Sequence, residues 1–383
     1  MSKVKVKEPA NVRSASVGAA GRQSTPVGQA ADAGRIGQSA KRTASRGRDD
    51  GALYLGIDLG TSRTSVSACN GARHTVLSCV GYCKDVIARK RLGQDVLLGQ
   101  AALDNRLAVD IVWPLHTGVI DTADKRARSA VRELLKHAMA LTDPVSDAPV
   151  YAVIGAPARA SLESQKAILD PVADLVSSVM IVSEPFAVAY GLDMLTESLV
   201  IDIGAGTTDL CRMHGTMPDQ TDQMTLPIGG DAVDERLEQE IHKRYPDVQL
   251  TRNMVRQLKE KYGFVRDPHQ TCTVTLTELG RPKEYDITDA LRVACQSIVP
   301  DIVDAIYQLI GTFDPEFQAR LRANVILAGG GSRLSGLPLL IENELKGLGG
   351  ASVTAVDDPT YAGSNGSLAM AMEMPKRYWN ALV

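Results

Sequence analysis

Two short stretches of the sequence place aspartate, glycine and hydroxyl residues in the same order. They are "GIDLGTS" at residues 56–62 and "DIGAGTT" at residues 202–208. Backbone N–H groups in glycine-rich turns can form concave sites for phosphate oxygens. Asp58 and Asp202 offer the oxygen ligands that Mg²⁺ prefers, and Mg²⁺ usually keeps several of its waters. Either stretch alone is also compatible with an ordinary β-turn, but the repeat predicts a phosphate and magnesium site built from both copies.

The segments that follow the two stretches are also similar to each other. Residues 63–70 alternate as a strand does, Asn70-Gly71 is typical of a hairpin turn, and residues 73–82 read as a third strand. Residues 209–213 and 222–230 repeat this order around a turn at His214-Gly215. Each copy is therefore a strand meander, which argues against a Walker-type loop or a Rossmann fingerprint, both of which lead into a helix. The pattern indicates an internal duplication.

Strands and helices alternate along the rest of the chain and predict an α/β fold with a cleft between two duplicated halves. Helices are expected over 121–141, over 160–175 with a break at Pro171, and once or twice over 284–313. Residues 324–348 read as a strand, a glycine loop and a helix. The predicted organisation is a disordered basic arm (1–51), a first half (52–198) and a second half (199–383).

Charge is unevenly distributed along the 383 residues, whose formal net charge is −3. Residues 1–50 hold ten Lys/Arg and four Asp/Glu, so the remaining chain is acidic. The arm has no aromatic residue and is expected to be disordered, while the acidic body makes nucleic acid an improbable main partner. The sequence has no apolar run of about 18 residues, so no membrane-spanning helix is expected. The six scattered cysteines, without a secretory signal, suggest reduced thiols in the cytoplasm.

These motifs resemble the ATPase superfamily that contains actin, the DnaK-type chaperones and the sugar kinases. The two aspartate–glycine stretches look like its two phosphate loops, and "LAGGGSRLSGLPLLI" looks like its adenosine motif. "WPLHTGVI" and "YAVIGAPARA" resemble the MreB family of bacterial actins, and "VRQLKEKYGFV" resembles the nucleotide-contacting helix of actin. Together with "SVMIVSEPFAVAYGLD", the set is most similar to the magnetosome-associated bacterial actins of the MamK family. The resemblance covers roughly residues 53–375.

The resemblance implies ATP and Mg²⁺ as ligands and an actin-like fold of two ribonuclease-H-like halves. It makes Asp58 and Asp202 magnesium ligands through water. It places the N–H and hydroxyl groups of Gly60, Thr61, Ser62, Gly204, Gly206 and Thr207 on the phosphates. Phosphoryl transfer depends on positioning and charge neutralisation, which suits such loops. Asp209 either assists the magnesium shell or caps a turn.

For the other candidates, the resemblance competes with a structural role. Glu184 would orient the attacking water, or it is a first-turn glutamate favoured by the helix dipole. Lys259 and Glu260 would contact adenine and ribose, or they form a solvated helix face. Gly329, Gly330, Gly331 and Ser332 would let the nucleotide approach the backbone beside a helix N-terminus, or they form a plain strand–helix turn.

The expected function is that of a cytoplasmic ATPase that polymerises with itself into cytoskeletal filaments and organises magnetosomes. Magnetosome-associated or acidic adaptor proteins are the expected further partners. A plasmid-segregating actin, a DnaK-type chaperone and a small-molecule kinase are the alternatives. Sedimentation with ATP separates the filament proteins from the other two. The long basic arm departs from what the magnetosome-associated family leads us to expect, which leaves the choice of partner open.

Overall fold

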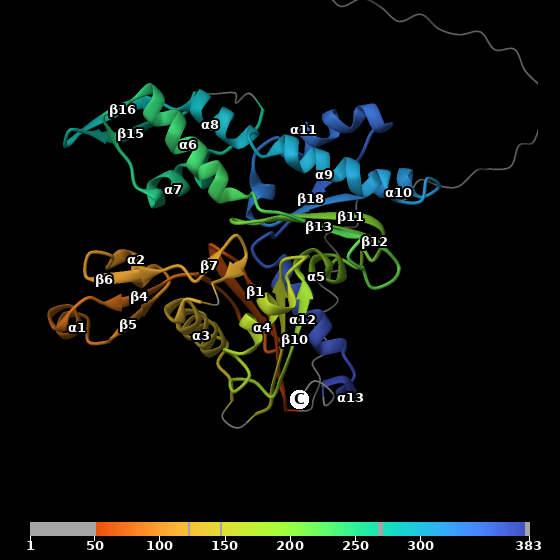
Figure 1. Ribbon diagram of the computed structural model, residues 1–383, viewed down its shortest axis with the longest axis horizontal. Coiled ribbons are helices and arrows are strands. Elements are labelled where there is room, and N and C mark those ends of the chain that lie inside the picture. Colours follow the sequence, from red (N-terminus) through yellow and green to blue (C-terminus); the bar gives the residue numbers. More distant parts are fainter. Residues whose placement is uncertain (1–50, 122, 146–147, 267–270, 380–383) are drawn as a thin grey trace, which may run out of the picture. The chain divides into compact units, whose positions relative to one another are not determined.

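The computed structural model describes residues 51–121, 123–145, 148–266 and 271–379. Two five-stranded sheets dominate these residues (Figure 1). The first runs in the order β10 (Ser178–Ser183), β9 (Val150–Ala156), β1 (Leu53–Leu59), β2 (Arg63–Ala68) and β3 (Arg73–Leu77). The second runs in the order β13 (Gln223–Leu226), β12 (Thr208–His214), β11 (Thr196–Ile203), β17 (Val325–Ala328) and β18 (Val353–Ala355). The predicted disorder of residues 1–50 lies outside the described residues.

Both sheets are built by the same strand pairings, so the duplication predicted from the two glycine stretches extends to the topology. In each, three consecutive strands pair antiparallel, and two later strands add in parallel beside the first. Asp58 and Asp202 occupy equivalent places near the ends of β1 and β11. The predicted turns are confirmed, because Gly71 and Gly215 each adopt a φ of +91° that suits glycine.

One predicted strand is divided in the structure. Residues 73–82 were expected to form a single strand, but β3 ends at Leu77 and β4 (Val80–Cys83) belongs to another sheet, with β5 (Val96–Leu98) and β6 (Val109–Val112). Ser78 lies at the break, where its N–H donates to the carbonyl of Ser62 and its hydroxyl donates to that of Gly60. These bonds to the first glycine loop redirect the chain after β3.

The region between β3 and β9 adds small elements and one long helix to the first half. They are α1 (Val86–Leu92), α2 (Gln100–Asp104), β7 (Leu115–His116), β8 (Val119–Ile120) and α3 (Lys125–Ala140). The predicted helix over 121–141 is thus confirmed as α3. The helix α4 (Leu162–Leu169) ends before Pro171, as expected, because proline cannot continue a helical hydrogen-bond ladder.

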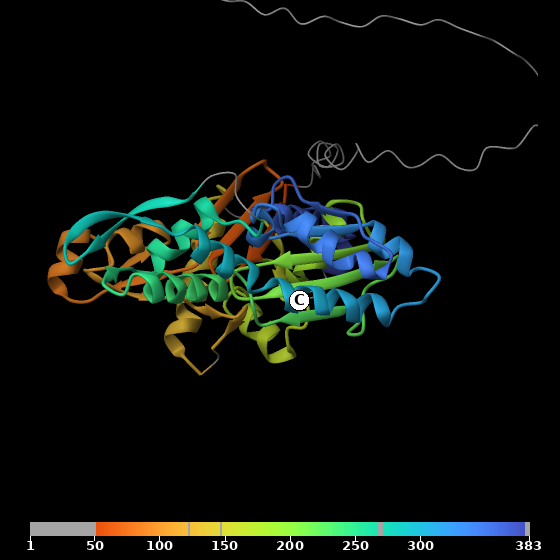
Figure 2. The same ribbon diagram turned by 90° about the horizontal axis from the view of Figure 1, so that it is seen from above.

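The second half carries its own small sheet and helices. The sheet is formed by β14 (Val248–Gln249), β15 (Thr273–Glu278) and β16 (Arg281–Asp286). The helices are α6 (Gly230–Arg244), α7 (Arg252–Tyr262), α8 (Thr288–Gln296), α9 (Val299–Gly311), α10 (Gln318–Ala323) and α11 (Leu337–Glu344). The helix expected from residue 284 begins only at Thr288, because residues 284–286 complete β16. Figure 2 shows the blue helices of this half lying along the green strands of the second sheet.

Two helices lie between the sheets, α5 (Glu184–Gly191) and α12 (Ala362–Glu373), and a short helix α13 (Lys376–Trp379) ends the described chain (Figure 1). They share an apolar core that includes Phe186, Met370 and Trp379. A Cβ on Gly366 would lie 1.8 Å from the carbonyl oxygen of Ala187, so only glycine allows the two helix backbones to approach this closely. The last helices therefore join both sheets into one fold.

Among the described residues, one segment, Thr288–Gly311, is long and apolar enough by length and composition to cross a membrane. It consists of α8 and α9, and 56% of its apolar window is buried inside the fold. Ile302, Ile306 and Ile310 belong to the core of the second half. The segment is therefore accounted for as a pair of core helices.

Candidate functional site

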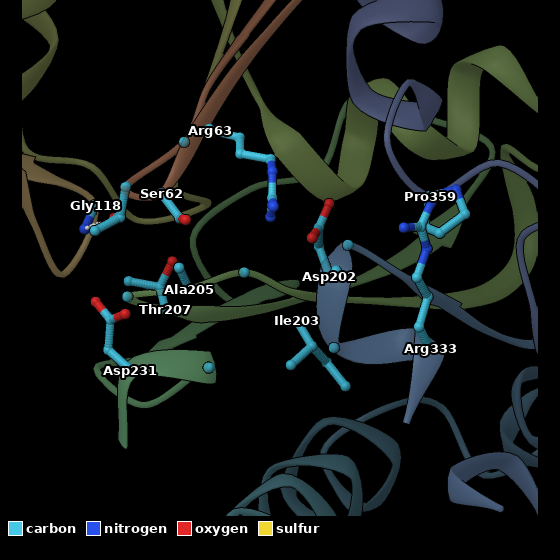
Figure 3. Close-up of a pocket in the computed structure, with 18 of the residues that line it drawn as sticks. Ser62, Arg63, Gly118, Asp202, Ile203, Ala205, Thr207, Asp231, Arg333 and Pro359 are labelled. Carbon is cyan, nitrogen blue, oxygen red and sulfur yellow. Dashed lines mark hydrogen bonds between the residues drawn. The ribbon is translucent and has the colours of Figure 1, made fainter. Parts of the chain in front are cut away.

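A pocket of about 350 Å³ brings the two glycine stretches together (Figure 3). It is lined by all the candidate site residues except Ser332 and Asp209. They are Asp58, Gly60, Thr61, Ser62, Glu184, Asp202, Gly204, Gly206, Thr207, Lys259, Glu260, Gly329, Gly330 and Gly331. Because they come from both sheets and from α5 and α7, the pocket is a cleft between the duplicated halves.

The two glycine loops close in the same way. The N–H of Gly60 donates to the carbonyl of Arg63 at 3.1 Å, and that of Gly204 donates to the carbonyl of Thr207 at 2.9 Å. The loops also meet a third turn, since the hydroxyl of Thr61 accepts the N–H of Gly118 at 3.0 Å. The repeated turn gives each half one loop at the same edge of its sheet.

Three carboxyl groups line the pocket near these loops. Asp58 lies in β1 and Asp202 in β11, while Glu184 begins α5 directly after β10. Burial raises the pKa of Asp58 to about 6. Burial also raises the pKa of Asp202 and Glu184 well above the ordinary range, and the charge of neighbouring aspartates raises it further. A bound cation beside these groups would favour their charged forms.

Asp209 lies on β12 opposite Asp202, outside the pocket lining, and contacts both halves. Its Oδ1 accepts the N–H of Ala158 at 2.8 Å and the hydroxyl of Thr225 at 2.6 Å. Its other oxygen makes no hydrogen bond with the described residues. Asp209 thus ties the loop after β9 to the second sheet.

The carboxyl groups of the pocket can hold a hydrated cation. In the described part of the chain, no three Asp, Glu, His or Cys side chains are grouped to hold a metal ion. Asp58 and Asp202 are nevertheless buried, mutually repelling carboxyl groups on one cavity. Mg²⁺ that keeps its waters can be bound through them by one or two carboxylates.

The predicted order of strand, glycine loop and helix over residues 324–348 is confirmed, but the helix begins later than expected. Gly330–Arg333 form a 3-10 turn, and α11 begins only at Leu337, so no helix N-terminus follows the glycines directly. Gly329 has a φ of +71°, and a Cβ there would lie 2.3 Å from Oδ1 of Asp202. Ser332 lies outside the pocket lining and donates its hydroxyl to the carbonyl of Gly329 at 2.8 Å. The segment is a tight turn that leaves its backbone close to Asp202.

Lys259 and Glu260 are adjacent on α7 and form different contacts. The ammonium group of Lys259 donates to the carbonyl of Gly230 at 2.6 Å and lies 2.9 Å from Asp234. The carboxylate of Glu260 accepts two hydrogen bonds from Arg63. Both residues line the pocket, so a wholly solvated helix face does not describe them.

Several charged residues of the lining were missed by the sequence analysis. Arg63, Arg256, Asp231 and Arg333 are among them, and Figure 3 shows Arg63 extending toward the middle of the pocket. Arg63 directly follows the first glycine stretch, so its position offered a signal. The others come from α6, α7 and the turn after β17, and nothing local in the sequence distinguishes them from surface charges.

The raised pKa values predict an unusual pH dependence of stability. A carboxyl group with a raised folded-state pKa stabilises the fold below its unfolded-state pKa, and this contribution is lost as pH rises through the folded-state value. For Asp58 this window runs from about 4 to about 6. We expect the melting temperature of the nucleotide-free protein to fall more steeply across this window in the wild type than in Asp58→Asn. Parallel curves would contradict the shift assigned to Asp58.

The two sheets have the same strand order, and each contributes a glycine loop to the cleft between them. This arrangement defines an actin-like protein. The sequence profile of the MreB/Mbl protein family matches residues 52–378. The chain belongs to this family, and the predicted actin-like fold is confirmed.

Two relatives named actin-like protein MamK share about two fifths of their residues with this chain. The one from Paramagnetospirillum magneticum is 41% identical over 330 residues, which span 86% of this chain and 95% of the relative. The one from Magnetospirillum gryphiswaldense is 40% identical over 342 residues, which span 89% and 95%. The predicted resemblance to MamK is confirmed.

Solved structures show the same relationship. A chain of a MamK double helical filament has a TM-score of 0.83 at 40% identity, covering 85% of this chain and all of that one. A non-polymerising MamK mutant bound to AMPPNP has a TM-score of 0.66 at 40% identity, covering 84% and 99%. One similar structure is thus a polymer and another holds an ATP analogue.

Proposed function

We propose that this chain is an ATP-binding and ATP-hydrolysing bacterial actin that polymerises into cytoskeletal filaments and organises magnetosomes. The observation that carries the proposal is the cleft, in which two equivalent glycine loops meet buried carboxyl groups. At 40% identity, the AMPPNP-bound MamK structure supports nucleotide binding, and the MamK filament supports polymerisation.

The phosphates of ATP are assigned to the two loops. Thr61, Ser62 and Thr207 offer hydroxyl groups there, and the glycines beside them offer backbone N–H groups. Asp58 and Asp202 would hold Mg²⁺ through water, and the ion would neutralise charge on the phosphates. The turn at Gly329–Gly331 and the α7 residues Lys259 and Glu260 border the part of the pocket assigned to adenosine.

Hydrolysis is assigned to Glu184. The oxygen of a water molecule attacks the γ-phosphorus, the bond to the oxygen of the β-phosphate breaks, and ADP leaves. The proton of the attacking water passes to the carboxylate of Glu184. Burial raises the pKa of this group, which brings its basicity nearer to that required of a general base at neutral pH.

Assembly is proposed to follow nucleotide binding, with further copies of this chain as the main partner. Magnetosome-associated or acidic adaptor proteins would bind the filament in the cytoplasm, along the magnetosome chain. Sedimentation of the purified chain with ATP, with ADP and without nucleotide tests the proposal when phosphate release is followed in the same samples. A chain that neither pellets with ATP nor releases phosphate would overturn it.

The basic arm provides a separate prediction. Deleting residues 1–50 should leave the melting temperature and ATP hydrolysis unchanged, because the arm has no aromatic residue and few large apolar ones. Bundling of filaments should decrease, since a basic arm can bridge acidic filaments and this attraction weakens with salt. Light scattering at low and high salt measures the bundling. A large fall in melting temperature on truncation would contradict this assignment.

A further inference from the structure

An ion pair joins the two walls of the pocket. Arg63 begins β2 in the first sheet, and Glu260 lies on α7 in the second half. The two guanidinium nitrogens of Arg63 donate to the two carboxylate oxygens of Glu260 at 2.8 and 3.0 Å. Such a bidentate pair fixes orientation as well as distance, and both residues line the pocket.

The same helix contacts the first half at a second place. Arg256, one turn before Glu260, approaches the hydroxyl of Ser62 at 3.5 Å. Its guanidinium also lies over the ring of Trp113, 5.7 Å from the ring centre. Ser62 belongs to the first glycine loop, so α7 is connected both to this loop and to the strand that follows it.

The Arg63–Glu260 ion pair is well formed, but it is partly exposed to solvent and can therefore break. Burial acts to raise the pKa of Glu260, but the hydrogen bonds and charge of Arg63, together with the charges of Arg256 and Lys259, lower it below the ordinary value. The side chains are 44% and 37% exposed. Water and salt therefore reach the pair and can compete for both partners.

We propose that Arg63 is a gating residue whose ion pair with Glu260 holds the cleft closed and slows nucleotide exchange. The inference rests on the proposed ATP-binding function. Separating α7 from β2 requires this pair to break, and the two elements form opposite walls of the pocket. In this role Arg63 acts through Glu260, without contacting the reacting phosphate.

The test measures exchange of mant-ATP, a fluorescent ATP analogue, on the full chain with Mg²⁺ and below the concentration of assembly. A gate must open for binding as well as for release. In Arg63→Gln we therefore expect the association and dissociation rates both to rise by about two- to fivefold, the size expected for a partly exposed ion pair. Arg63→Lys keeps the charge but loses the bidentate geometry. Its association and dissociation rates should lie between those of the wild type and those of Arg63→Gln.

The matched control is Arg132→Gln. Arg132 also makes a paired contact with a carboxylate, that of Asp174, but both belong to the first half and lie outside the pocket. Its exchange rates should equal those of the wild type. Raising salt should speed exchange in the wild type, which tests the gate even if Arg63→Gln folds poorly. In a folded Arg63→Gln protein, salt should have less effect.

Three results would overturn the proposal that Arg63 gates nucleotide exchange. Unchanged rates in both Arg63 variants would show that the pair does not limit exchange. Faster dissociation with unchanged association would make Arg63 a direct nucleotide contact. If the wild type binds no mant-ATP under any condition, the proposed function fails and the gate fails with it.

Discussion

Replacing Glu184 with alanine is expected to slow phosphate release by on the order of 10²–10⁴-fold, the usual contribution of a positioned general base. ATP binding and pelleting should persist, because neither requires an ordered water. Filaments of the variant should therefore last longer than those of the wild type. The measurement pairs sedimentation with phosphate release over time in one sample.

The control for Glu184 is another glutamate in the first turn of a helix. Glu163 lies in the first turn of α4, where the helix dipole favours it in the same way. Glu163→Ala should leave hydrolysis unchanged. If Glu184→Ala hydrolyses ATP at the wild-type rate, Glu184 is only a first-turn residue. If the variant folds but cannot bind ATP, the water must be positioned by another group in the cleft.

Replacing Asp202 with asparagine should have two opposite effects. Mg²⁺ affinity should fall by about 10–100-fold, the range found for groups that act through a ligand already on the metal, and ATP binding should lose its Mg²⁺ dependence. The nucleotide-free protein should become more stable, because asparagine removes a charge whose burial raises the pKa of Asp202. The melting temperature should rise by about 2–4 °C for each kcal/mol gained.

Asp209→Asn provides the contrast, because Asp209 lies opposite Asp202 on the neighbouring strand. Burial raises the pKa of Asp209 as well, but its carboxylate accepts hydrogen bonds from Ala158 and Thr225 that partly offset the cost of burying it. The substitution weakens these bonds, so it should stabilise the nucleotide-free protein less than Asp202→Asn does, and it should leave the Mg²⁺ dependence of ATP binding unchanged. Melting curves with and without Mg²⁺-ATP distinguish the two variants. An Asp202→Asn protein that is less stable without nucleotide, yet is stabilised by Mg²⁺-ATP as the wild type is, would show that Asp202 is structural.

Much of the site could be predicted from the sequence because its signals are local. The glycine loops need particular residue types within a few positions, and the apolar runs that precede them mark β1 and β11 directly. Repetition then linked Asp58 to Asp202, although 144 positions separate them. Charge composition likewise distinguished the basic arm from the acidic body.

Tertiary structure decided the features that depend on partners distant in sequence. The pairing of Arg63 with Glu260 spans 197 positions, and Ala158 meets Asp209 across the two halves. The break after β3 arises from hydrogen bonds to the first glycine loop, and α11 begins only after a 3-10 turn. Local propensity cannot reveal such contacts, because their energy exists only once the two sheets have been brought together around the cleft.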